Sequence, residues 1–183
     1  FDNMFFESGD EIPTERFIQT RIEAEIAFCM KGPLEGEVTR EQVLQATDYV
    51  FPSLEILDTR IFRKDESTGK MRTVFDTISD NAANAGVISG VQKNDPQKFD
   101  LRRVGSIVMR NNEVEETGLG AGVLNDPITG IIWLVKRLSE YNQKISPGEI
   151  ILSGSFIRPI EARKGDEFYA DFGDFGFVEC KFN

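Results

Sequence analysis

The 183-residue chain contains no histidine, and this absence removes several kinds of chemistry. Without imidazole, Ser-His-Asp and Cys-His catalysis, His-ligated zinc and imidazole acid/base chemistry are excluded from these residues. Cysteine is scarce as well: Cys29 and Cys180 lie far apart and form no C-x-x-C motif. We therefore expect two reduced thiols, which favours a cytoplasmic location.

Positive charge is in deficit, with 21 Lys and Arg against 31 Asp and Glu and a formal net charge of −10. Nucleic-acid binding depends on clustered Lys and Arg, so no nucleic-acid partner is expected. No apolar run is long enough to span a membrane, so no membrane partner is expected either. The length suits one domain, and the chain begins at Phe1 without an initiator Met. We expect residues 1–183 to form a single domain that lacks an upstream N-terminal segment.

Two extended segments place acidic side chains among apolar ones. In residues 21–28, the alternation of a β-strand sends Glu23 and Glu25 to one face and the apolar side chains to the other. In residues 53–57, Glu55 alone interrupts an apolar run, and a lone acid is costly to bury without a partner. A solvated outer face is the commoner explanation for any E-x-E pattern. Three carboxylates around one hard divalent cation would explain both segments, and oxygen ligands favour magnesium or manganese over zinc or copper.

Local signals predict two helices. Thr39 followed by Gln42 is a capping box, which predicts a helix that continues to about Tyr49 and stops before Pro52. A second, clearly amphipathic helix is predicted to begin at residues 126–127, an Asp-Pro pair that provides an N-cap and a first helical residue.

Short strands and turns make up most of the remaining pattern. Residues 63–72 are expected to form an exposed loop or hairpin tip, and residues 101–109 and 113–117 a hairpin that turns at Asn111 and Asn112. Further strands are predicted at 149–152, 167–172 and 177–182. Many short strands with two modest helices indicate an α+β fold that is mainly β.

Other motifs favour ordinary structural roles. The glycines at 118, 120 and 122 permit close backbone approach but lack the spacing of a dinucleotide-binding motif. The Asp-Phe-Gly tripeptides at 171–173 and 174–176 are interpreted as turns at strand ends. Arg21 and Arg158 are expected to pair with the excess of surface acid rather than to hold a substrate.

Five stretches carry a family signature, within a similarity that covers nearly the whole chain, from residue 4 to residue 182. They are EAEIAF at 23–28, ATDYV at 46–50, LEILDTR at 54–60, the segment 74–86 and SGSF at 153–156. Together they resemble the hydratase/decarboxylase branch of the fumarylacetoacetate hydrolase superfamily. Within this branch, residues 76–83 are similar to the dioate hydratases, whereas the decarboxylases differ in this segment.

The resemblance implies a fold like the C-terminal domain of that superfamily, with rolled or sandwiched mixed β-sheets and a few short helices. It implies a homo-oligomer and a divalent metal, Mg²⁺ or Mn²⁺, with Glu23, Glu25 and Glu55 as the three protein ligands. The Lys and Asp proposed for acid/base work in this family lie upstream of the E-x-E strand, in a region that this sequence does not include. No acid/base residue is therefore assigned.

The implied activity is a hydro-lyase reaction in aromatic-compound catabolism, the metal-dependent addition of water to a 2-oxo-4-enoic acid. The most specific expectation is conversion of 2-oxohept-4-ene-1,7-dioate to 4-hydroxy-2-oxoheptane-1,7-dioate in homoprotocatechuate breakdown. Asn81 and Ser155, in loops of small residues, are candidates for holding the carboxylates of this small anionic substrate. The alternatives are a 4-oxalocrotonate-type decarboxylase, a metal-dependent acylpyruvate hydrolase, and a β-rich assembly subunit that binds no metal.

Overall fold

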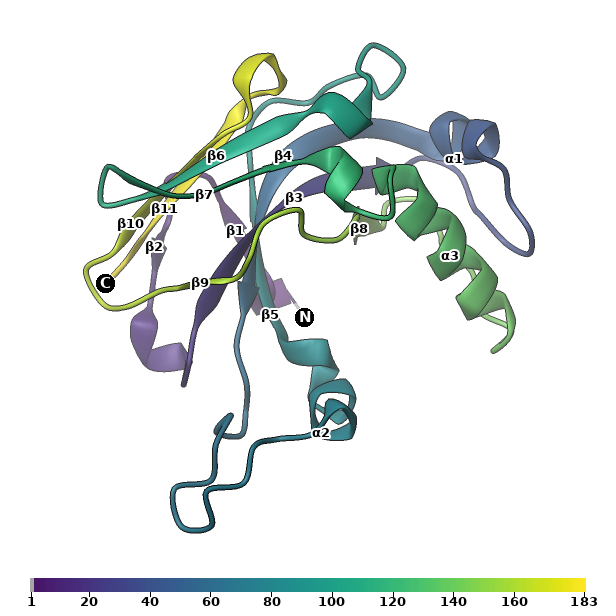
Figure 1. Cartoon of the computed structure of the whole chain (residues 1–183). Helices are drawn as coiled ribbons and strands as arrows, with labels where there is room; N and C mark the ends of the chain where they lie inside the picture. The colour runs from purple at the N-terminus through teal and green to yellow at the C-terminus, as the bar shows by residue number, and fades with distance from the viewer. Residues whose placement is uncertain (1) are drawn as a thin grey trace.

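The computed structural model describes residues 2–183, and two mixed β-sheets dominate it (Figure 1). In the first sheet, all neighbours are antiparallel except the parallel pair β1 and β5. The order of its strands is β1 (Phe5–Glu7), β5 (Asn84–Ser89), β4 (Thr47–Leu57), β3 (Arg21–Met30) and β8 (Ile150–Leu152), and β9 (Ile160–Glu161) also pairs with β3.

The second sheet contains the predicted hairpin. The order of its strands is β2 (Glu11–Ile12), β11 (Phe177–Phe182), β10 (Glu167–Asp171), β6 (Gly105–Arg110) and β7 (Glu113–Leu119). β6 and β7 meet at Asn111 and Asn112, whose φ values of 55° and 66° are typical of a tight hairpin turn, so this prediction is confirmed. The strand expected from residue 101 begins later, because Leu101–Arg103 forms a 3₁₀ turn.

Three α-helices accompany the sheets, one more than predicted. α1 (Arg40–Ala46) begins with the predicted capping box of Thr39 and Gln42. It ends at Ala46 rather than Tyr49, because β4 begins at Thr47. The prediction that Pro52 ends a helix is wrong, since Pro52 lies within β4 opposite Ile26. The proline is tolerated there because β5 ends at Ser89, so no regular ladder is interrupted on that side.

The amphipathic helix α3 (Pro127–Ser139) is confirmed, with the Asp126 side chain accepting a hydrogen bond from the Ile128 N–H at 3.0 Å. Figure 1 shows α1 and α3 together at one end of the molecule. Residues 60–80, here called the arm, project from the sheets at the bottom of Figure 1 and carry α2 (Val74–Ser79). The remaining helical turns are of the 3₁₀ type, at Asp2–Met4, Thr14–Arg16, Asn81–Ala83, Leu101–Arg103, Gly120–Gly122 and Gly173–Phe175.

The hydrophobic core lies between the two sheets. From β3 it takes Ile22, Ala24, Ile26 and Phe28, all with no exposed surface, and from the second sheet it takes Phe168 and Phe182 among others. Because side chains alternate along a strand, the opposite face of β3 carries the two glutamates. The acidic face of β3 therefore points away from the core. The predicted fold class, α+β and mainly β, is confirmed. Among the described residues, no helix has the length and apolar character needed to cross a membrane.

Candidate metal centre

Strand pairing brings the three predicted glutamates together. In the antiparallel ladder of β3 and β4, Glu23 lies directly opposite Glu55, and Glu25 lies two residues further along the same face of β3. Carboxylate oxygens of Glu23, Glu25 and Glu55 all lie within 4.8 Å of one another. The pairing of β3 and β4, which spacing along the sequence could not establish, therefore brings the three carboxylates into one acidic cluster.

Burial makes this cluster electrostatically unfavourable on its own. Glu25 is only 2% exposed, and Glu23 and Glu55 are half-buried. Burial and then the charge of Glu55 raise the pKa of Glu23 from its usual 4.5 to about 7, although the nearby Arg21 opposes the rise. Burial, the Glu55 charge and a hydrogen bond with Glu55 raise the pKa of Glu25 as well, against the effect of the Gly154 N–H. Carboxylates held at this spacing in a low-dielectric site favour a proton or a cation between them.

Two neutral donors orient the carboxylates. The Gly154 backbone N–H donates to Glu25 Oε2 at 2.7 Å, and the Asn84 Nδ2 donates to Glu55 Oε1 at 2.6 Å. Sequence reasoning missed Asn84 as part of the site. The available signal was its position at the end of the segment 74–86, a stretch that the family resemblance singled out. Outer hydrogen bonds of this kind fix the direction of a ligating carboxylate.

The loop that supplies the Gly154 N–H is held by a close backbone contact. A Cβ atom on Gly118 would lie 2.0 Å from the Phe156 carbonyl oxygen, so only glycine fits at position 118. Gly154 itself has a φ of 111°, which L-residues rarely adopt. The close approach predicted for the glycine stretch is thus confirmed, and its partner is the 153–156 loop over Glu25.

The two predicted substrate-binding residues are already engaged in local structure. The Asn81 Nδ2 donates to the Asn84 carbonyl at 3.1 Å, and Asn81 has a φ of 51°. The Ser155 hydroxyl donates to the Ile157 carbonyl at 2.9 Å and accepts from the Ile157 N–H at 3.2 Å. The nearby Ser153 hydroxyl, by contrast, is buried without a partner in the described chain. The substrate-binding roles of Asn81 and Ser155 stay predictions.

The donor set fits a hard divalent cation. All three side chains offer carboxylate oxygens, and the cluster contains neither thiolate nor imidazole. Oxygen-only sets of this kind suit magnesium, calcium or manganese, and a divalent charge offsets the burial and the repulsion that together raise the pKa of Glu23.

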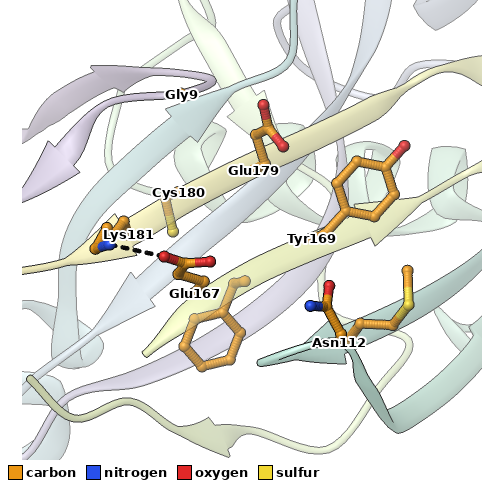
Figure 2. A pocket seen from close by; sticks show the side chains of 9 residues that line it. Gly9, Asn112, Glu167, Tyr169, Glu179, Cys180 and Lys181 are labelled. Atoms are coloured by element: carbon orange, nitrogen blue, oxygen red, sulfur yellow. Dashed lines mark hydrogen bonds and ion pairs between the residues drawn. The ribbon is translucent and has the colours of Figure 1, made fainter. Parts of the chain in front are cut away.

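A separate hollow of about 450 Å³ lies on the solvent face of the second sheet, and Figure 2 shows the side chains that line it. Lys181 and Glu167 both line the hollow and form an ion pair, with 2.7 Å between Lys181 Nζ and Glu167 Oε1. Burial raises the pKa of the Cys180 thiol to about 12, so the thiol stays protonated and unreactive. The hollow shares no residue with the glutamate cluster, and it offers no comparable set of converging donors.

Comparison with known proteins finds relatives of this chain that are named as hydratases. No family model matches the chain. The 2-oxo-hept-4-ene-1,7-dioate hydratase of Escherichia coli is 50% identical over 182 residues, which are 99% of this chain and 68% of that protein. The 2-keto-4-pentenoate hydratase of Paraburkholderia xenovorans strain LB400 is 34% identical over 183 residues, covering 100% of this chain and 66% of that protein.

A solved structure gives the same result for the fold. The 4-oxalocrotonate decarboxylase from Pseudomonas putida G7, in complex with magnesium and adipate, superposes with a TM-score of 0.90 at 29% identity. The match covers 100% of this chain and 67% of that one. Another structure of the same enzyme contains calcium and acetate. The chain therefore belongs to the hydratase/decarboxylase branch of the fumarylacetoacetate hydrolase superfamily, and it spans about two thirds of the length of these relatives.

Proposed function

We propose that this chain forms the metal-binding part of a hydratase that adds water to a 2-oxo-4-enoic acid, specifically 2-oxohept-4-ene-1,7-dioate, giving 4-hydroxy-2-oxoheptane-1,7-dioate. The observation that carries the proposal is the convergence of Glu23, Glu25 and Glu55 from two paired strands. The 50% identical relative, which bears the name of this hydratase, supports the choice of substrate.

In this proposal Glu23, Glu25 and Glu55 hold one divalent cation, Mg²⁺ or Mn²⁺. When bound, such an ion supplies Lewis-acid stabilisation of negative charge that develops on the 2-oxo group of the substrate. The Asn84 amide and the Gly154 N–H keep two of the carboxylates oriented, and the 153–156 loop shields Glu25 from water. The glutamates act as ligands rather than as bases, because a bound cation lowers the basicity of a carboxylate.

The test is the substitution Glu23→Gln, which keeps the shape of the side chain and removes its charge. We expect Mg²⁺ binding to weaken by at least about a hundredfold and Mg²⁺-dependent hydration to be lost, because an uncharged ligand replaces one of three carboxylates. Calorimetric titration with Mg²⁺ measures the first effect, and product analysis measures the second. Glu113→Gln is the matched control, since Glu113 is an exposed strand glutamate outside the cluster. Unchanged Mg²⁺ binding in Glu23→Gln would contradict the ligand assignment.

A 4-oxalocrotonate-type decarboxylase is the second candidate, favoured by the structural match to the P. putida enzyme at a TM-score of 0.90. It would use the same ion and release carbon dioxide, so product analysis separates it from a hydratase. An acylpyruvate hydrolase generally uses a histidine to activate water, and the sequence contains none. An assembly subunit without enzymatic activity would show no tight divalent binding.

We also propose that residues 1–183 act as one catalytic-type domain within a cytoplasmic homo-oligomer. A single hydrophobic cluster joins the two sheets, and both cysteines are free thiols, as expected for a reducing compartment. Light scattering coupled to size-exclusion chromatography measures the oligomeric state; a monomer at every protein concentration would contradict the oligomer.

A further inference from the structure

Three arginines converge beside the glutamate cluster. Arg21 lies two residues before Glu23 in β3, on the same face of the strand. Arg63, at the base of the arm, donates from its N–H to Gln19 Oε1 at 2.8 Å and from Nη2 to the Gln19 carbonyl at 2.6 Å. The Arg72 N–H in turn donates to the Arg63 carbonyl at 2.9 Å. Backbone contacts thus bring arginines from the arm to the start of β3.

The three arginines, here called the arginine cluster (Arg21, Arg63 and Arg72), adjoin the acidic cluster. Arg21 shares its face of β3 with Glu23, and the hydrogen bonds to Gln19 attach Arg63, and through it Arg72, next to the start of that strand. Burial and then the charges of Arg21 and Arg72 lower the pKa of Arg63, in keeping with this arrangement.

The arginine cluster has no carboxylate partner, although the protein is rich in acid. Across residues 2–183, no ion pair within 4.0 Å involves Arg21, Arg63 or Arg72, whereas Arg158 pairs with Glu116 at 2.7 Å. The expectation that Arg158 pairs with surface acid is confirmed, and the same expectation for Arg21 is wrong. Arg21 Nε and Arg72 Nη1 are buried and have no hydrogen-bond partner in the described chain.

Two acids beside the arginine cluster are engaged elsewhere. Glu161 lies opposite Arg21 in the β3–β9 pair, but in the described chain neither Glu161 nor Asp58 forms an ion pair with the cluster. Asp58 accepts hydrogen bonds from the Ile18 and Gln19 N–H groups at 2.9 and 2.6 Å, and Glu161 pairs with Arg163 at 3.2 Å. Clustered like charges with buried, unpaired donors are unfavourable unless something satisfies them. A planar guanidinium is well suited to a carboxylate, which can accept two parallel hydrogen bonds.

We infer that the arginine cluster is an anion subsite that holds the second carboxylate of a dicarboxylic substrate whose 2-oxo acid end lies at the glutamate cluster. This inference rests on the proposed function, and it assigns the residues that hold the distal carboxylate of the substrate. The spacing is suitable: Arg21 and Glu23 are separated along β3 by about 7 Å. A seven-carbon dicarboxylate has six carbon–carbon bonds of about 1.5 Å, and in an extended zigzag its terminal carbons lie roughly 7–8 Å apart.

The test compares two ligands that differ only in the distal carboxylate. 2-Oxoheptanedioate and 2-oxoheptanoate are titrated calorimetrically into the Mg²⁺-saturated chain. We expect the dicarboxylate to bind about 10- to 100-fold more tightly, the ratio typical of charge-assisted hydrogen bonds. Arg72→Gln should reduce this ratio to nearly one and leave 2-oxoheptanoate binding unchanged. Lys70→Gln is the matched control, because Lys70 is an exposed cation in the same hairpin without an ion pair.

The outcomes separate this inference from the function on which it rests. Equal Mg²⁺-dependent binding of both ligands to the unaltered chain would overturn the anion subsite and leave the proposed metal centre standing. No binding of either ligand to the Mg²⁺-loaded chain would overturn the proposed function, and the subsite with it. A dicarboxylate preference that survives Arg72→Gln and also Arg21→Gln would place the subsite elsewhere and overturn the assignment to these arginines.

Discussion

The floor of the site and the arm beside it are built in opposite ways. In the floor, formed by β3, β4 and β5, the apolar side chains are buried in one continuous core. In the arm, the large apolar side chains are exposed, and α2 has no buried residue. The exposed apolar residues of the arm are Ile61, Phe62, Met71, Val74, Phe75 and Ile78. Packing explains the sequence of the floor but not that of the arm.

The arm is instead attached through polar contacts. Arg60 pairs with Asp80 at 3.4 Å and donates from Nη2 to the Asn84 carbonyl at 3.0 Å, which joins the two ends of the arm. Between them, Asn81, Ala82 and Ala83 have φ values of 51°, 52° and 67°. Left-handed backbone costs roughly 1–2 kcal/mol per L-residue, so this turn persists only because its surroundings hold it. The difference indicates that packing stabilises the floor, whereas polar contacts at its two ends hold the arm in place.

The largest effect of an added methyl group is expected at Gly118 of β7, where the 153–156 loop packs directly against the backbone. Gly118→Ala places a methyl group 2.0 Å from the Phe156 carbonyl oxygen, which is backbone and cannot move without shifting the 153–156 loop. We expect a loss of about 2–3 kcal/mol in the free energy of unfolding, typical of overpacking. This corresponds to a fall in Tm of roughly 4–10 °C, measured by calorimetry.

Gly122→Ala is the matched control for this prediction. Its new methyl group would approach the same residue, Phe156, but at the side-chain Cβ and at 3.3 Å. A few tenths of an ångström of adjustment relieve that contact, so its effect should be clearly smaller. Equal effects of the two substitutions would mean that backbone approach to Phe156 does not hold the loop over Glu25.

A middle-sized effect is expected from pH at the acidic cluster. Because the pKa of Glu23 is raised from 4.5 to about 7 in the folded chain, metal-free folded protein binds more protons than unfolded protein between these values. The protonated Glu23 side chain therefore contributes to the stability of the metal-free chain at acidic pH, and this contribution is lost as pH rises through about 7. Binding of Mg²⁺ must displace this proton, so the Glu23 proton alone makes the affinity rise about tenfold per pH unit below 7, and the raised pKa of Glu25 adds to this slope.

Calorimetry in buffers of different ionisation enthalpy measures both the affinity and the number of protons released. Glu23→Gln removes the titrating group and serves as the control for its share of the proton release. An Mg²⁺ affinity that stays constant across the acidic range would show that the glutamates of the floor do not bind the ion.

Local signals in the sequence were sufficient for the parts of the fold that depend on few residues. The capping box at Thr39, the N-cap at Asp126 and the turn at Asn111 and Asn112 each involve a side chain and a backbone group a few positions apart. Pro52 misled the prediction because its tolerance in β4 depends on where β5 ends, which is tertiary information.

For the candidate site, too, local signals were sufficient for some residues, whereas others depended on tertiary contacts. Alternation placed Glu23 and Glu25 on one face, and the lone Glu55 in an apolar run indicated the second strand. Asn84 and the free Arg21 were missed, because one is defined by a contact across 29 residues and the other by the absence of a partner. Neither property is visible in spacing along the chain.

The smallest effect is expected on the exposed face of the arm, and it can be measured with one substitution made at two sites. Ile78 is 65% exposed on α2, whereas Ile88 has no exposed surface in β5. Ile88→Ala should cost about 2–5 kcal/mol in the free energy of unfolding, because it leaves a cavity in the core. Ile78→Ala should change it by no more than about 0.5 kcal/mol, since it removes no intramolecular packing.

Denaturant unfolding at several protein concentrations gives the decisive comparison. If the arm serves only to carry Arg63 and Arg72, Ile78→Ala is silent at every concentration. A destabilisation that grows with protein concentration would instead show that the apolar face of α2 is covered by a second copy of the chain, because association stabilises the folded state by mass action. The arm would then resemble the floor in being packed, with the difference that its packing partner lies in another molecule.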